Sequence, residues 1–290
     1  MENFIATIQQ SIIADPKVTG LLVVHKTTPF SPLVDGFDAL FLVVMEQASE
    51  QNYINHYSKD GLAIQERRIS QAALWQWIVT GENRSIIEWI LQGEICLDRD
   101  TFLESTRHRL LEFPLDMREQ KLLIEFSLFL RRYLQSKQYL KNGHHLDAHS
   151  NILEALHHWA GIAIIEQGYH PEVTVWQQIK KINPGVYKLY EELTLNEETL
   201  EQRVQLVLLA CEFNVMSKMA DCCRILIKTL EQRELPFSPM ELKYHPILGP
   251  LHVDMALLLK QLVKRGLIRE VITVDHGDDS HSFDVRYTSV

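Results

Sequence analysis

An apolar strand entered through a carboxylate is the feature that most constrains the fold of this chain. It runs from 37 to 45 and follows an earlier apolar strand at 20–26. Side chains alternate between the two faces of a strand, so carboxylates two residues apart would point to the same side and could share a divalent metal. Here Asp38 is followed two residues later by Leu40. The segment therefore predicts a metal site on the second strand of a sheet, with one ligand missing.

The length and composition of the chain limit its class. Its 290 residues exceed one ordinary domain and predict two or three modules. Hydrophobic residues make up 46% and charged residues 23%, which is typical of a soluble globular protein. The net charge of −9 argues against a general nucleic-acid binder, because Lys and Arg supply most of the non-specific affinity for phosphates.

The sequence also indicates where the protein works. No apolar run approaches the roughly 20 residues that a membrane helix needs. The N-terminus does not resemble a secretion signal, and the four cysteines do not form the pattern of a disulfide framework. We therefore expect a cytoplasmic protein that does not associate with membranes.

The hydrophobic period divides the chain into segments. Residues 1–115 mix short helices with β-like segments, and Asp60-Gly61 between two of these segments predicts a hairpin. From 116 to 235, apolar residues recur at helical spacing, with a break at Asn183-Pro184-Gly185, which predicts an antiparallel helical bundle. We therefore expect an α+β protein in which a small mixed sheet (1–115) precedes a bundle (116–235) and a third module (236–290).

The third module is predicted to follow the order of a winged-helix half. A helix over 251–264 leads through Arg265-Gly266 to strands at 271–274 and 283–288, which a polar loop connects. The module contains six Lys and Arg residues against seven Asp and Glu residues, and the loop carries Asp278 and Asp279. A wing normally contacts phosphates, so an acidic wing favours packing or protein contact over DNA binding.

This succession of modules resembles the polymerase-beta-type nucleotidyltransferase superfamily, and most closely its divergent bacterial branch of nucleotidyltransferase-like proteins. The resemblance covers the whole chain. It implies in-line attack of an acceptor on the α-phosphate of a nucleoside triphosphate, assisted by Mg²⁺ ions, with the helical domain shaping the acceptor pocket. In that superfamily a Gly-Ser pair after the first strand opens a helix and holds the triphosphate. Two carboxylates on the next strand and a third on a later strand bind the metals.

The resemblance assigns candidate site residues. Asp38 matches the first metal-binding carboxylate, and Leu40 stands where the second should be. Glu66 matches the third carboxylate. The Gly-Ser position falls in the segment 27–32, where Thr27, Thr28 and Ser31 provide hydroxyl groups for the nucleotide but the glycine that lets backbone approach phosphate is absent.

Asp35 has two interpretations that the sequence leaves open. It lies three positions before Asp38, a spacing that places the two on opposite faces of a regular strand. A bulge at Gly36 would realign them, so that Asp35 and Asp38 together hold a metal and Asp35 joins the catalytic residues. In the other interpretation, Asp35-Gly36 is a turn that enters the strand.

Three functions follow from these residues. The missing carboxylate at Leu40 and the missing Gly-Ser pair favour a weakly active or inactive pseudo-enzyme that senses a nucleotide or contacts a protein. The first alternative is an active nucleotidyltransferase that uses Mg²⁺ and a nucleoside triphosphate on a small-molecule, protein or RNA acceptor. The second is a DNA-binding regulator that uses the third module, against which the acidic charge of that module argues. No pattern in the sequence predicts an oligomeric state.

Overall fold

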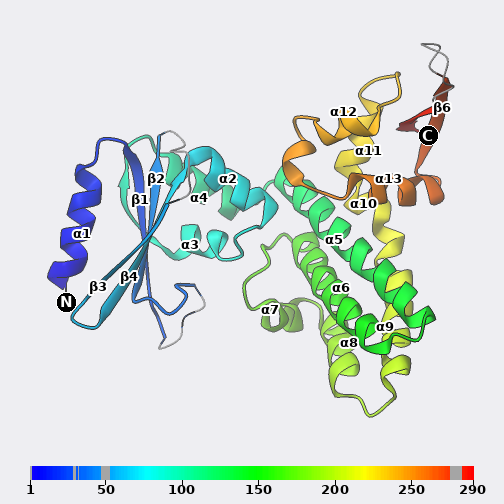
Figure 1. Ribbon diagram of the computed structural model, residues 1–290, viewed down its shortest axis with the longest axis horizontal. Helices are drawn as coiled ribbons and strands as arrows, with labels where there is room; N and C mark the ends of the chain where they lie inside the picture. Colours follow the sequence, from blue (N-terminus) through cyan, green and yellow to red (C-terminus); the bar gives the residue numbers. More distant parts are fainter. Residues whose placement is uncertain (1, 29–30, 32, 47–52, 275–282) are drawn as a thin grey trace. The chain divides into compact units, whose positions relative to one another are not determined.

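A computed structural model of the chain describes residues 2–28, 31, 33–46, 53–274 and 283–290. The chain forms two compact units, Met1–Pro114 and Leu115–Val290. The division falls beside the expected end of the first module at 115. The α+β fold class is confirmed, since a mixed five-stranded sheet is followed by a helical unit (Figure 1).

The first unit is a mixed sheet with helices on both faces. Its strands run in the order β3-β4-β2-β1-β5, and β2 and β4 are parallel whereas the other neighbours are antiparallel. The elements in chain order are α1 (Glu2–Ala14), β1 (Val18–His25), β2 (Ala39–Met45), β3 (Tyr53–Lys59), β4 (Leu62–Ser70), α2 (Gln71–Thr80), α3 (Ile86–Gln92), β5 (Glu94–Asp98) and α4 (Phe102–Glu112).

The predicted hairpin is confirmed between β3 and β4. Lys59 pairs with Leu62, so Asp60 and Gly61 are the two turn residues. Both have positive φ angles, 52° and 80°. Two consecutive left-handed residues are what a tight hairpin turn requires, and Asp-Gly provides them at low cost.

Alternation along the strands gives the sheet two apolar faces. The odd-numbered residues of β2 cluster with Ile8 and Ile12 of α1, together with Leu21, Val23 and Ile64 from the neighbouring strands. The even-numbered residues face α2, α3 and α4, where Gly20 lies against Leu103 of α4. Because both faces are covered, every residue of β2 is buried (Figure 1).

The second unit is built around two long antiparallel helices. Its elements are α5 (Leu115–Lys141), α6 (His145–Glu166), α7 (Val175–Ile182), α8 (Pro184–Leu195), α9 (Leu200–Asn214), the 3₁₀ turn η1 (Met216–Lys218), α10 (Met219–Cys222), α11 (Arg224–Glu231), α12 (Pro239–Lys243), the 3₁₀ turn η2 (Gly249–Leu251), α13 (Met255–Lys264), β6 (Ile268–Val274) and β7 (Phe283–Ser289). The break expected at 183–185 is the start of α8. The Asn183 side chain accepts from the Val186 amide, and Pro184 occupies the first turn.

The C-terminal segment has the predicted order of helix, strand and strand, and it lies in the same compact unit as the bundle. Asp254 caps the start of helix α13, and its amide donates to the Ser127 hydroxyl of α5 at 3.0 Å. Asp254 also pairs with Arg131 of α5 at 2.9 Å. Asp278 and Asp279 of the expected wing lie outside the described residues. The assignment of this segment as a winged helix stays a prediction.

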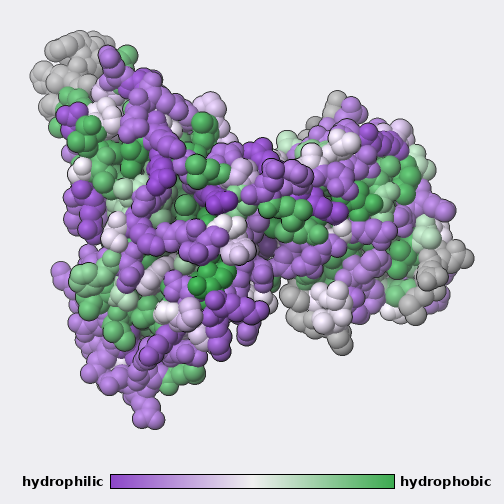
Figure 2. Space-filling model, turned by 180° about the vertical axis from the view of Figure 1, so that it is seen from behind, coloured by the Kyte–Doolittle hydropathy of each residue, from purple (hydrophilic) through white to green (hydrophobic). Residues whose placement is uncertain are grey.

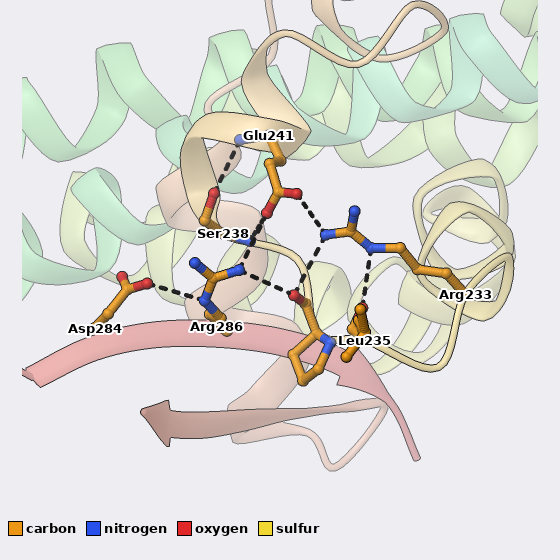
Figure 3. A network of polar contacts seen from close by, with 7 residues as sticks. Arg233, Leu235, Ser238, Glu241, Asp284 and Arg286 are labelled. Atoms are coloured by element: carbon orange, nitrogen blue, oxygen red, sulfur yellow. Dashed lines mark hydrogen bonds and ion pairs between the residues drawn. The ribbon is translucent and has the colours of Figure 1, made fainter. Parts of the chain in front are cut away.

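A polar network around Glu241 joins the loop before α12 to the last strand (Figure 3). The Glu241 carboxylate pairs with Arg233 at 2.6 Å and with Arg286 of β7 at 3.5 Å. It also accepts from the Ser238 amide at 2.7 Å, while the Ser238 hydroxyl accepts from the Glu241 amide at 3.1 Å. This reciprocal capping box fixes the start of α12 next to β7.

Hydrophobic side chains on the face drawn in Figure 2 occur in separate patches among hydrophilic ones. In the part of the chain that the structure describes, no helix has the length and apolar character to cross a membrane. The four cysteines are free thiols.

Candidate functional site

Asp38 lies at the entrance of β2, where its carboxylate is held by the protein itself. Its Oδ1 accepts from the Lys26 ammonium group at 2.7 Å, and its Oδ2 accepts from the Ala63 amide at 2.8 Å. These two hydrogen bonds lower the pKa of Asp38, the Lys26 contact having the larger effect. Asp38 is therefore ionised at neutral pH, and both of its oxygens already have donors.

The neighbours of Asp38 on the same face of the sheet are not carboxylates. Leu40 is fully buried and pairs with Val24 of β1 and Gln65 of β4. Gln65 lies between His56 and Arg67, and its Oε1 accepts from Arg67 Nε at 2.5 Å. An apolar side chain and an amide thus occupy the two strand positions where further metal ligands would complete a site with Asp38.

Glu66 lies on the other face of the sheet. It follows Gln65 by one residue, and Ile64, two residues before it, packs in the cluster beneath α1. Glu66 is fully buried and accepts from Tyr57 Oη and Arg68 Nε, both at 2.5 Å. Arg68 also forms an ion pair with Asp15, which lies just after α1, with 3.1 Å between Arg68 Nη1 and Asp15 Oδ2. The structure therefore does not bring Glu66 to Asp38, because one residue of strand offset reverses the direction of a side chain.

Asp35 and Gly36 form a turn before the strand. Both residues have positive φ angles, 48° and 84°, and the Phe37 amide donates to the Val34 carbonyl at 2.9 Å. β2 begins only at Ala39, so no bulge in the strand aligns Asp35 with Asp38. Instead Asp35 Oδ2 accepts from Arg67 at 3.1 Å. Of the two interpretations left open by the sequence, the turn is the one observed.

The described residues of the hydroxyl-bearing segment after β1 do not open a helix. The described residues between 26 and 38 include a turn at 33–36 and no helical residue. Thr27 and Thr28 are exposed, whereas Ser31 is buried and its carbonyl accepts from the Val34 amide at 3.3 Å. The backbone arrangement with which the family cradles a triphosphate, a glycine turn leading into a helix N-terminus, is therefore missing from these residues.

Each of the three predicted carboxylates forms an ion pair with a Lys or Arg side chain of the same chain. Lys26 pairs with Asp38, Arg67 with Asp35, and Arg68 with Glu66. Nowhere in the described ranges do three or more His, Cys, Asp or Glu side chains gather in a way that could hold a metal ion. The charge that a divalent ion would neutralise is already neutralised from within the chain.

Sequence reasoning missed Lys26, Gln65 and Arg67 as members of this face. The alternation of side chains along each strand could have identified them. Lys26 follows the even-numbered residues of β1, which face the same side as Asp38. On β4, Gln65 and Arg67 face the side opposite to Ile64 and Glu66. Arg67 lies over the Trp89 ring of α3, with 5.3 Å between the guanidinium carbon and the ring centroid. The identification of Trp89 as its support needed the tertiary fold.

Comparisons with known proteins match this architecture. Residues 1–118 match the family model described as nucleotidyltransferase-like, and residues 119–218 match the model described as YgxA-like substrate binding domain. The uncharacterized protein YgxA of Bacillus subtilis (strain 168) is 34% identical over 268 residues, which cover 92% of this chain and 91% of that protein. The crystal structure of a nucleotidyltransferase-like protein from Exiguobacterium sibiricum 255-15 is similar with a TM-score of 0.86 and 32% identity, covering 98% of both chains.

Proposed function

Because the chain belongs to the nucleotidyltransferase-like family and carries a YgxA-like substrate-binding domain, we propose that it is a pseudo-enzyme of this fold. In this proposal the metal and triphosphate site is degraded, and the protein is weakly active or inactive in nucleotidyl transfer. It acts by sensing a nucleotide or contacting a protein, in the cytoplasm and without binding nucleic acid.

The pairing of Asp38 with Lys26 is the observation that carries the proposal. A nucleotidyl transfer site must hold Mg²⁺ with carboxylates while the substrate phosphates complete the coordination. Asp38 offers both oxygens to donors of the chain, at 2.7 and 2.8 Å, so a metal would have to displace an ammonium group that is already in hydrogen-bonding contact. Leu40 and Gln65 beside it offer no second carboxylate. The side chains present therefore do not fit a pair of Mg²⁺ ions.

Titration calorimetry with ATP and CTP tests this proposal. We expect the heats measured with Mg²⁺ and with EDTA to be the same, and we expect no labelled nucleotide to be transferred to any acceptor in a cell extract. Asp38→Ala should leave both results unchanged. Asp60→Asn is the matched control, because Asp60 lies in the hairpin turn and Asn tolerates its left-handed conformation.

The opposite result would identify an active enzyme. Micromolar binding that requires Mg²⁺, is lost in Asp38→Ala and is kept in Asp60→Asn would contradict the proposal. It would mean that Lys26 leaves Asp38 when nucleotide and metal arrive, and that Mg²⁺ and a nucleoside triphosphate are the cofactors of this protein.

A further inference from the structure

A polar cavity of about 430 Å³ opens beside Arg67 in the first unit. Its wall combines β4, the end of α2, the loop that follows and the beginning of α3, and it also includes the turn before β2. It is lined by Asp35, Arg67, Trp77, Glu82, Asn83, Arg84, Ser85 and Trp89. A volume of this size is in the range of pockets that hold metabolites.

The cavity is rich in hydrogen-bond donors that the protein does not use. The Arg84 guanidinium group makes no hydrogen bond or ion pair with any residue that the structure describes. Ser85 precedes α3, and its hydroxyl makes no capping hydrogen bond. Asn83 accepts from the Ser85 amide through Oδ1, so its side-chain amide is left to face the cavity or solvent. Unused donors favour a ligand that is rich in acceptors.

Arg67 adds a positioned cation to this set. Its side chain is 19% exposed and lies over the Trp89 ring, and its Nε is held by Gln65. One terminal nitrogen donates to Asp35, which is 59% exposed. Arginine presents five donors in a rigid fork, so a guanidinium group with two of its nitrogens occupied still offers N–H groups to a second anion.

The acidic side chains of the cavity do not favour a cationic ligand, because both already have interaction partners. Asp35 is neutralised by Arg67. Glu82, the other acid in the wall, lies two residues from Arg84 and also has an interaction partner. The unsatisfied groups are thus cationic or neutral donors, and the geometry favours an anion with several oxygens, for which arginine is well suited in proteins.

We propose that this cavity binds a phosphate-bearing metabolite of about mononucleotide size without a divalent cation. Arg84, Arg67 and Ser85 donate to the phosphate oxygens, and Trp77 lines the space for the organic part. The inference rests on the nucleotide-sensing part of the proposed function and replaces the metal-dependent triphosphate site by arginine contacts. Asp35 competes with the ligand for Arg67, so it weakens binding.

Two substitutions that should change the affinity for AMP in opposite directions test the site. Titration of the full chain with AMP in EDTA at low salt should give saturable binding, which Arg84→Gln weakens at least about tenfold because it removes a charge-assisted hydrogen bond. Asp35→Asn should tighten AMP binding several-fold, since Asn keeps the left-handed turn but releases Arg67. Arg224→Gln, at an exposed arginine of the second unit, should leave the affinity unchanged.

Three probes identify what the cavity recognises. We expect AMP to bind at least about tenfold more tightly than adenosine, because the phosphate supplies the charge. Inorganic phosphate that binds as tightly as AMP would overturn the mononucleotide size of the proposed ligand, because the organic part would then contribute nothing to binding. Absence of AMP binding in EDTA, equal binding of adenosine, or indifference to Arg84→Gln would each overturn the inference. Those results would leave the proposed loss of metal-dependent chemistry intact, since that proposal fails only with Mg²⁺-dependent binding through Asp38.

Discussion

At the scale of single residues, the carboxylates that would hold metal in this fold are balanced by cations from the same chain. The three pairs differ in burial, and this decides what each contributes. Both side chains of Lys26–Asp38 are partly exposed, and Asp35 of the Arg67–Asp35 pair is exposed, so solvent screens both pairs and their contribution to stability is small. The Glu66 side chain is completely buried, and it accepts hydrogen bonds from Arg68 and Tyr57, which are partly exposed. Glu66 is therefore a structural carboxylate of the α1 face.

Glu66→Ala should destabilise the protein by about 3 kcal/mol, because it empties a fully buried site and removes the acceptor of both Tyr57 Oη and Arg68 Nε, while Arg68 keeps only its ion pair with Asp15. Glu66→Gln should cost less, since the amide oxygen still accepts from Tyr57. Urea unfolding followed by circular dichroism measures both. Glu94→Ala on β5 is the control, because Glu94 is exposed on the same sheet and should change stability by less than about 0.5 kcal/mol. A cost for Glu66→Ala no larger than that of the control would contradict the structural role.

At the scale of elements, the sequence predicted the parts that depend on local chemistry. The Asp60-Gly61 hairpin, the apolar strands and the long helices follow from turn propensity and hydrophobic period, and all are present. The sequence predicts Glu66 in one metal site with Asp38, whereas the structure places the two side chains on opposite faces of the sheet, because the face of each residue depends on the register of β2 against β4. The start of α8 at Pro184 was interpreted as a break, although Asn before Pro is also a helix start. Asn183-Pro184 is compatible with either a break or a helix start, and the packing of the bundle decides between them.

The polar network between α12 and β7 predicts how the stability of the protein changes at low pH. The Ser238 amide, and then the Arg233 guanidinium group, lower the pKa of Glu241 to about 2 from its usual 4.5. A carboxylate whose pKa is lower in the folded state stabilises the protein above the unfolded pKa, and this stability is lost as the pH falls through the folded pKa. The loss should therefore begin below about pH 4.5 and continue toward pH 2.

The measurement is the difference in free energy of unfolding between the wild type and Glu241→Gln. We expect the wild type to be more stable at pH 7 and the difference to narrow between pH 5 and pH 3. Glu234→Gln, an exposed neighbour, should show no such change. A difference that stays constant over this range would mean that the Figure 3 network does not depend on the charge of Glu241.

At the scale of the whole molecule, each compact unit has its own core. The first is centred on β1 and β2 between α1 and the α2–α4 layer, and the second on α5 and α6. Units with separate cores unfold as separate cooperative blocks unless their unfolding is strongly coupled. We therefore expect scanning calorimetry to resolve two transitions in the full chain.

Two core substitutions assign the transitions to the units. A Cβ on Gly93 would lie 2.3 Å from Leu22 Cδ2 and 2.6 Å from the Trp89 carbonyl, so Gly93→Ala should lower the transition of the first unit. Leu156 is fully buried in α6, and Leu156→Ala should lower the other transition by an amount that corresponds to about 2–5 kcal/mol. Gly81→Ala is the control for Gly93, since it also ends a helix but has open space around it and should cost about 1 kcal/mol through its positive φ. A single transition that both core substitutions lower equally would instead mean that the site in the sheet and the helical substrate-binding domain fold as one cooperative block.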